Sequence, residues 1–133
     1  KASHICCLYP CTPLLKPQYL TDSFERWQSS NSLYCFPVLE FESNVLRSLK
    51  LSDTGEVSSM FSQHELTRTQ DLPQAYFDAG QFYWGSREAW LSEDKIHNHA
   101  LGYVLPKYSV VDIDDDNDWR FAERLYQAQL ALA

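Results

Sequence analysis

The sequence is poor in glycine and in basic side chains, and both shortages exclude classes of function. Its 133 residues include only four glycines, and these form neither a P-loop nor a dinucleotide-binding loop. Eleven basic side chains stand against eighteen acidic ones, which gives a formal net charge of -7. Because non-specific nucleic-acid binding depends on lysine and arginine neutralising phosphates, this balance argues against a nucleic-acid partner.

Cysteine pairs, long apolar runs and a secretory signal are missing too. The four cysteines form no CxxC pair, and adjacent cysteines rarely bridge each other, so we expect reduced thiols: Cys6, Cys7, Cys11 and Cys35. A zinc site using His4 with Cys7 or Cys11 is the alternative, although its spacing matches no common ligand framework. Without a membrane-length apolar run or a basic-then-apolar leader, the sequence predicts a cytoplasmic protein with no membrane partner.

The length and the alternation of elements predict one α/β domain over residues 1–133, with a mixed sheet and flanking helices. Strands are expected at 4–9, 32–41, 45–51, 57–61, 76–84, 103–105 and 108–113, and helices at 17–30, 86–91 and 116–131. The first strand is expected to be central and buried because it is short, apolar and followed by Pro10 and Pro13. Ser86 is expected to cap the second helix.

The densest group of chemically active side chains is the acidic run from Asp112 to Asp118. In a strand, Asp112 and Asp114 point to the same face and can meet one cation, and two carboxylates suit Mg²⁺. The other aspartates of the run are expected to cap the last helix. A calcium loop is a further alternative, because Asp112, Asp114, Asp116 and Glu123 follow EF-hand spacing, but Asn117 replaces the turn glycine.

A second candidate for metal binding is the pair formed by His97 and His99. The two side chains could bind a metal ion on one strand face. No third ligand is in register with them, so the sequence favours an ordinary surface loop here.

The stretch from Arg68 to Gly85, RTQDLPQAYFDAGQFYWG, joins a polar loop to an aromatic strand. Together with Val111-Asp112-Ile113-Asp114 and Asp118-Trp119, it resembles the C-terminal part of the acylneuraminate cytidylyltransferases, most closely the branch that activates pseudaminic acid with CTP. The resemblance runs from Ile5 to Tyr126. Phe77 departs from the histidine typical of that branch, and residues 78–81 differ from the Asn-Gly pair of sialic-acid-activating relatives.

The resemblance implies a nucleotide-diphospho-sugar-transferase-like fold, a sugar acid and CTP as substrates, and Mg²⁺ held by Asp112 and Asp114. A guanidinium is the natural partner of the sugar carboxylate, so Arg68 is the first candidate to bind it and Arg47 the second. Sugar contacts are further expected from four side chains: Gln70, Tyr76, Gln81 and Tyr83.

The family's glycine- and lysine-containing nucleotide loop does not precede Lys1 in this sequence. We therefore expect a truncated cytidylyltransferase-like module that keeps the sugar pocket and the metal aspartates and is inactive alone. The alternative is a working CMP-pseudaminic or CMP-sialic acid synthetase once the N-terminal part is supplied. Loss of early strands would expose a sheet edge, which predicts a homodimer.

Overall fold

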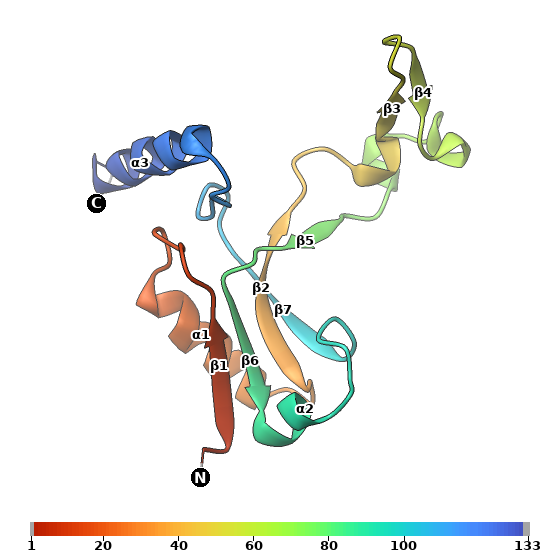
Figure 1. The fold of residues 1–133 in the computed structure, drawn as a ribbon. Helices are drawn as coiled ribbons and strands as arrows, with labels where there is room; N and C mark the ends of the chain where they lie inside the picture. Colours follow the sequence, from red (N-terminus) through yellow and green to blue (C-terminus); the bar gives the residue numbers. More distant parts are fainter. Residues whose placement is uncertain (1, 132–133) are drawn as a thin grey trace. The chain divides into compact units, whose positions relative to one another are not determined.

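The structure, a computed structural model, describes residues 2–131 and divides into two compact units. The first unit comprises the described residues up to Leu39 together with those from Asp78 onward, and the second is Glu40–Phe77. Figure 1 shows the elements of both along the chain.

The first unit contains a mixed sheet. Strand β6 (Phe82–Ser86) lies between β1 (His4–Leu8) and β2 (Tyr34–Glu40) and is antiparallel to both, whereas β7 (Ala100–Val104) pairs with β2 in parallel. Helices flank these strands (Figure 1). The α/β class with a mixed sheet predicted from the sequence is therefore confirmed.

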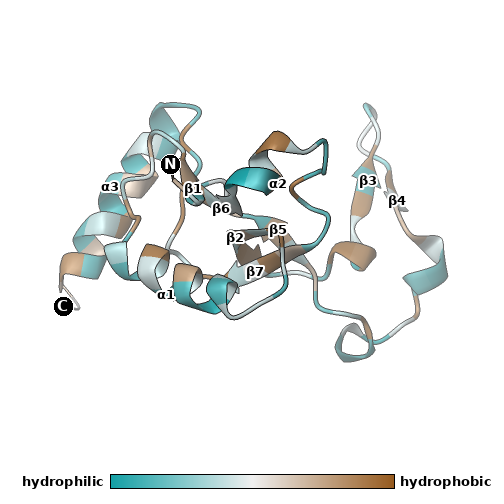
Figure 2. Ribbon diagram, turned by 90° about the horizontal axis from the view of Figure 1, so that it is seen from below, coloured by the Kyte–Doolittle hydropathy of each residue, from teal (hydrophilic) through white to brown (hydrophobic). Residues whose placement is uncertain are grey.

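Two helices cover opposite faces of this sheet (Figure 2). Helix α1 (Pro17–Gln28) begins with a proline, which costs no hydrogen bond in the first turn. The short α2 (Arg87–Leu91) begins where the Ser86 hydroxyl accepts a hydrogen bond from the Ala89 N–H, as the sequence predicted. The last helix, α3 (Asp116–Ala131), has the predicted bounds.

The core of the first unit lies between α1 and the sheet. Trp27, Cys35, Leu39 and Tyr103 are buried together there. Both indole groups in this layer have hydrogen-bond partners, because Trp27 Nε1 donates to the Ser32 carbonyl and Trp84 Nε1 donates to the Ser23 hydroxyl. A polar contact thus ties the β6 face to α1 within an otherwise apolar layer.

On the opposite face, Gly85 allows Trp90 to lie against the sheet. A Cβ atom at position 85 would come within 2.5 Å of Trp90 Nε1 and 2.9 Å of Tyr34 Cδ1. The two rings meet edge to face with centroids 5.4 Å apart, and the Tyr34 hydroxyl donates to the Ala89 carbonyl. A side chain at position 85 would therefore displace α2 from the sheet.

Strand β1 forms as predicted but is not the buried central strand that the sequence suggested. Within residues 2–131 it pairs with β6 alone, and four of its five residues are exposed. Ile5 and Leu8 remain 37% and 53% exposed. The prediction of burial failed because an apolar run indicates a strand but does not show which other elements pack against that strand.

The second unit is a small, largely exposed hairpin region. Strands β3 (Leu49–Leu51) and β4 (Val57–Ser59) pair antiparallel, as predicted, around a turn that includes Gly55. The predicted strand start at 45–48 is wrong, because Val45–Arg47 forms a 3-10 helix capped by the Asn44 side chain, which accepts from the Leu46 N–H. The hydrogen bond from the backbone to the Asn44 side chain stabilises this turn in place of the strand that the alternating residues suggested.

Further 3-10 turns, Ser62–His64 and Thr69–Asp71, lead to β5 (Tyr76–Asp78). The single strand predicted over 76–84 is thus two strands. Between them Gly80 adopts φ +61°, a left-handed conformation that suits glycine, and its N–H donates to the Asp78 carboxylate.

Among residues 2–131, no helix is long and apolar enough to span a membrane. The four cysteines, all within this range, are free thiols, as predicted.

Candidate functional site

The two aspartates predicted to bind metal lie in an irregular extended segment, not in a strand. The structure assigns no strand between β7 and α3 within the described residues, so the predicted strand over 108–113 is wrong. Exposure nevertheless alternates: Val111 and Ile113 are half-buried, while Asp112 and Asp114 are exposed. Both carboxylates are therefore open to solvent, as a metal-binding pair requires.

Hydrogen bonding separates these two aspartates from Asp115 and Asp118. The Asp115 carboxylate accepts from the N–H groups of Asn117 and Asp118, and the Asp118 carboxylate accepts from those of Asp114 and Asp115. These bonds satisfy free amides at the start of α3, as predicted for Asp115 and Asp118, whereas the Asp116 carboxylate makes no such bond among the described residues. Within the described chain, no hydrogen bond engages the carboxylates of Asp112 and Asp114.

Two exposed carboxylates without hydrogen bonds are compatible with the ligand requirements of Mg²⁺. Residues 2–131 contain no cluster of three histidine, cysteine, aspartate or glutamate side chains that could hold an ion. Mg²⁺ needs only one or two protein carboxylates, because water and phosphate oxygens complete its shell. The calcium-loop alternative does not fit, since Asp116 and Glu123 both lie on α3 and not in a loop.

A mainly apolar cavity of about 580 Å³ adjoins this acidic segment in the first unit. Ile113 and the α3 residues Trp119, Ala122 and Tyr126 form one wall, and the turn around Cys11, with φ 59°, forms another. Its size is within the range of small-molecule sites. Trp119 and Tyr126 remain 56% and 47% exposed there.

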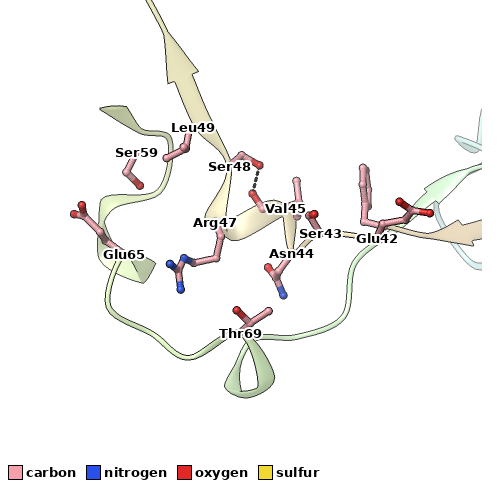
Figure 3. Close-up of a pocket in the computed structure, with 11 residues that line it drawn as sticks. Glu42, Ser43, Asn44, Val45, Arg47, Ser48, Leu49, Ser59, Glu65 and Thr69 are labelled. Atoms are coloured by element: carbon pink, nitrogen blue, oxygen red, sulfur yellow. Dashed lines mark hydrogen bonds between the residues drawn. The ribbon is translucent and has the colours of Figure 1, made fainter. Parts of the chain in front are cut away.

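The second unit contains a more polar cavity of about 810 Å³ (Figure 3). The guanidinium of Arg47 points into this space, toward the region between Asn44, Glu65 and Thr69. Arg47 Nη1 also donates to the Thr67 carbonyl at 2.8 Å, which places it beside the segment that contains Arg68. Of the two arginines predicted to bind the sugar carboxylate, Arg47, the second candidate, therefore lines this cavity.

The other predicted sugar contacts of this unit are accessible. Arg68 and Gln70 are exposed in and beside the Thr69–Asp71 turn, and Tyr76 on β5 is 49% exposed. These three side chains can meet a ligand without rearrangement. Arg68 is not one of the cavity-lining residues.

The two predicted contacts of the first unit are buried. Tyr83 is 6% exposed and packs between Tyr9 and Phe36, with ring centroids 5.2 and 5.6 Å away. Gln81 is 2% exposed, and its Oε1 atom has no hydrogen-bond partner among the described residues. A ligand reaches either side chain only if its cover moves.

Sequence reasoning missed a polar cluster around Asp78. The Tyr83 hydroxyl donates to the Asp78 carboxylate at 3.0 Å, and His97 Nε2 lies 3.2 Å from Asp78 Oδ2. Burial, then the hydrogen bond to Asp78, raises the pKa of Tyr83, so its hydroxyl stays protonated. His97 lies in an exposed loop, as the sequence favoured, and its contact with Asp78 was not predicted.

The thiols of Cys6 and Cys35 are unsuited to nucleophilic catalysis. Burial raises the pKa of Cys6 and of Cys35 to about 11 in each case. Because the thiolate is the reactive form, both groups are inert near neutral pH. This agrees with the absence of a nucleophile motif in the sequence.

Comparison with known proteins identifies relatives over almost the whole chain. The chain is 40% identical over 125 residues to a pseudaminic acid cytidylyltransferase of Campylobacter jejuni, a match that covers 93% of this chain and 54% of that protein. It is 32% identical over 124 residues to a Helicobacter pylori protein named pseudaminic acid cytidylyltransferase and UDP-2,4-diacetamido-2,4,6-trideoxy-beta-L-altropyranose hydrolase, covering 92% of this chain and 24% of that protein.

A more distant match extends to animals. The N-acylneuraminate cytidylyltransferase B of Danio rerio is 26% identical over 121 residues, or 90% of this chain and 29% of that protein. No family model matches the chain. The chain spans about half the length of the Campylobacter relative and less than a third of the length of the other two. Over that span it is homologous to pseudaminic acid cytidylyltransferases, as the sequence motifs indicated.

Proposed function

We propose that this chain, a homologue of pseudaminic acid cytidylyltransferases, binds a nonulosonic acid and a Mg²⁺ ion as part of the transfer of a cytidylyl group from CTP to that sugar acid. The observation that carries the proposal is 40% identity over 93% of the chain. The match includes both the Arg68–Gly85 stretch and the acidic run, because it spans 125 of 133 residues.

Arginines supply the recognition of the acid group. A guanidinium donates two parallel hydrogen bonds to a carboxylate, and Arg68 is exposed with its donors accessible. Arg47 can add a second positive charge from the cavity wall. Gln70 offers hydrogen bonds to sugar hydroxyls, and Tyr76 offers an apolar ring face.

Asp112 and Asp114 would hold the metal ion through their free carboxylates. Bound there, Mg²⁺ would neutralise negative charge on the nucleotide phosphates as pyrophosphate leaves. The reaction joins the anomeric hydroxyl of the sugar acid to the α-phosphate of CTP. The chain's contribution to it is positioning and charge compensation, without a covalent intermediate.

The decisive assay measures pyrophosphate release from CTP with Mg²⁺ and either pseudaminic acid or N-acetylneuraminic acid, in parallel with calorimetric binding of each sugar acid. Release that requires Asp112 and Asp114 would identify a catalytic role. Binding of sugar acid without release would identify a binding module. Neither binding nor release with either sugar acid would refute the proposal.

We also propose a homodimer formed through the free edge of β1. The Tyr9 N–H donates to the Gln81 carbonyl. Because residues of an antiparallel strand point their N–H groups alternately toward and away from the partner strand, the N–H of Leu8 points away from β6. An exposed edge with apolar side chains and no lysine invites pairing with a second strand.

The Leu8→Pro variant is expected to be monomeric where the unmodified chain is dimeric at micromolar concentration, because proline removes the outward N–H. Light scattering coupled to size-exclusion chromatography measures this. Leu8→Ala, which shortens the side chain and keeps the N–H, should remain dimeric. A monomeric unmodified chain would contradict the proposal.

A further inference from the structure

The mainly apolar cavity of the first unit, about 580 Å³ in volume, lies between helix α3 and the turn around Cys11. None of the predicted sugar contacts lines it. Ile113 lines it and is half-buried, whereas the neighbouring Asp112 and Asp114 are exposed and do not line it. The cavity wall therefore contains neither carboxylate of the proposed metal pair.

Two aromatic rings on the cavity wall have no ring or cation partner within residues 2–131. Trp119 and Tyr126 lie two turns apart on α3 and remain 56% and 47% exposed. Neither ring belongs to an aromatic pair in that range, and the one cation–π contact there joins Arg26 to Tyr103. The faces of aromatic rings carry partial negative charge, so both rings are available to a cation.

The charged side chain on the cavity wall is a carboxylate, that of Glu123. Glu123 follows Trp119 by four residues and precedes Tyr126 by three, so it lies on the same face of α3 as both rings. No ion pair engages Glu123 within the described chain. The basic residues of α3, Arg120 and Arg124, do not line the cavity. Its wall therefore carries one negative charge and no positive charge.

The chemistry of this wall distinguishes between kinds of organic cation. A primary ammonium group has three N–H donors and is strongly hydrated, so a mainly apolar cavity would leave some of its donors unpaired. A quaternary ammonium group has no N–H donor. Its alkyl surface suits apolar walls, and its charge is attracted by ring faces and by a carboxylate. The cavity therefore favours a quaternary over a primary ammonium group.

We propose that the cavity between α3 and the Cys11 turn binds a small quaternary ammonium compound, whose charged head contacts Trp119, Tyr126 and Glu123. The volume is within the range of small-molecule sites, so the cavity can also hold an apolar substituent of the ammonium group. This site is additional to the sugar-acid and metal sites of the proposed function and does not depend on them.

Titration of the full chain with choline, followed by nuclear magnetic resonance, tests the proposal. The comparison ligand is the neutral alcohol in which a carbon atom replaces the ammonium nitrogen of choline. Choline should shift the indole N–H signal of Trp119 and bind at least about threefold more tightly than the alcohol, because a cation alone is attracted by the rings and the carboxylate. Trp119→Leu and Glu123→Gln should each lower that preference at least about twofold.

Phe121→Leu is the matched control, because Phe121 lies on the same helix and is 52% exposed but does not line the cavity. It should leave the preference for choline unchanged. All three side chains are exposed, so the urea midpoint should stay the same in each variant. Equal affinity for choline and the alcohol, a preference that survives both Trp119→Leu and Glu123→Gln, or absence of choline binding would overturn the proposal. None of these results alters the expected binding of a sugar acid.

Discussion

Replacing Asp112 and Asp114 together by asparagine is expected to abolish metal binding at the acidic segment. Both carboxylates are exposed and free of hydrogen bonds, so the change removes two anionic ligands and leaves the capping bonds of Asp115 and Asp118 in place. Loss of two direct metal ligands should weaken metal affinity by more than the roughly 10- to 100-fold typical of changes to residues that only contact the ligands.

Mn²⁺ provides a direct readout, because it shares the preference of Mg²⁺ for oxygen ligands and broadens nearby nuclear magnetic resonances. In the unmodified chain, signals from residues 111–115 should broaden first. In the double variant that selectivity should vanish, whereas Asp53→Asn, which alters an exposed aspartate in the hairpin turn, should change nothing. Broadening that persists in the double variant would place the metal elsewhere.

Truncation of Phe82 to alanine is expected to cause the largest loss of stability in the first unit. Phe82 is 0% exposed on β6, the strand that pairs with both β1 and β2. Truncation of a buried phenylalanine to alanine lowers the free energy of unfolding by about 3–5 kcal/mol, which includes the cost of the cavity that remains. Domains of this kind are stable by about 5–15 kcal/mol, so the loss is a large share of the total.

Chemical denaturation by urea measures this effect, with Phe121→Ala as the matched control. Phe121 lies on α3 and is 52% exposed, so its truncation should change the free energy of unfolding by less than about 0.5 kcal/mol. Equal losses from the two substitutions would show that the sheet is not the stabilising core of this unit.

Local signals in the sequence predicted the helices well. Helix α3 has the predicted bounds because apolar spacing and an acidic first turn agree, and α2 begins at the predicted serine cap. The hairpin around Gly55 was likewise readable from its turn residues. Where several local preferences point to the same structure, sequence reasoning suffices.

The failures arose where a distant partner or a short-range competitor decides the structure. Alternating residues at 45–51 looked like a strand, but the Asn44 cap converts the start into a 3-10 turn. The pairing of Asp78 with His97, nineteen positions apart, has no local signal at all. The unpaired Gln81 acceptor is also invisible in sequence, because burial and hydrogen bonding are properties of the fold.

The central claim is that this chain recognises a nonulosonic acid through its arginines, and calorimetric titration of pseudaminic acid tests it most directly. The unmodified chain should bind, Arg68→Ala should bind at least about tenfold more weakly because a charge-assisted hydrogen bond is lost, and Arg124→Ala, on exposed α3, should match the unmodified chain. Equal affinity in all three, or no binding to the unmodified chain, would contradict the account.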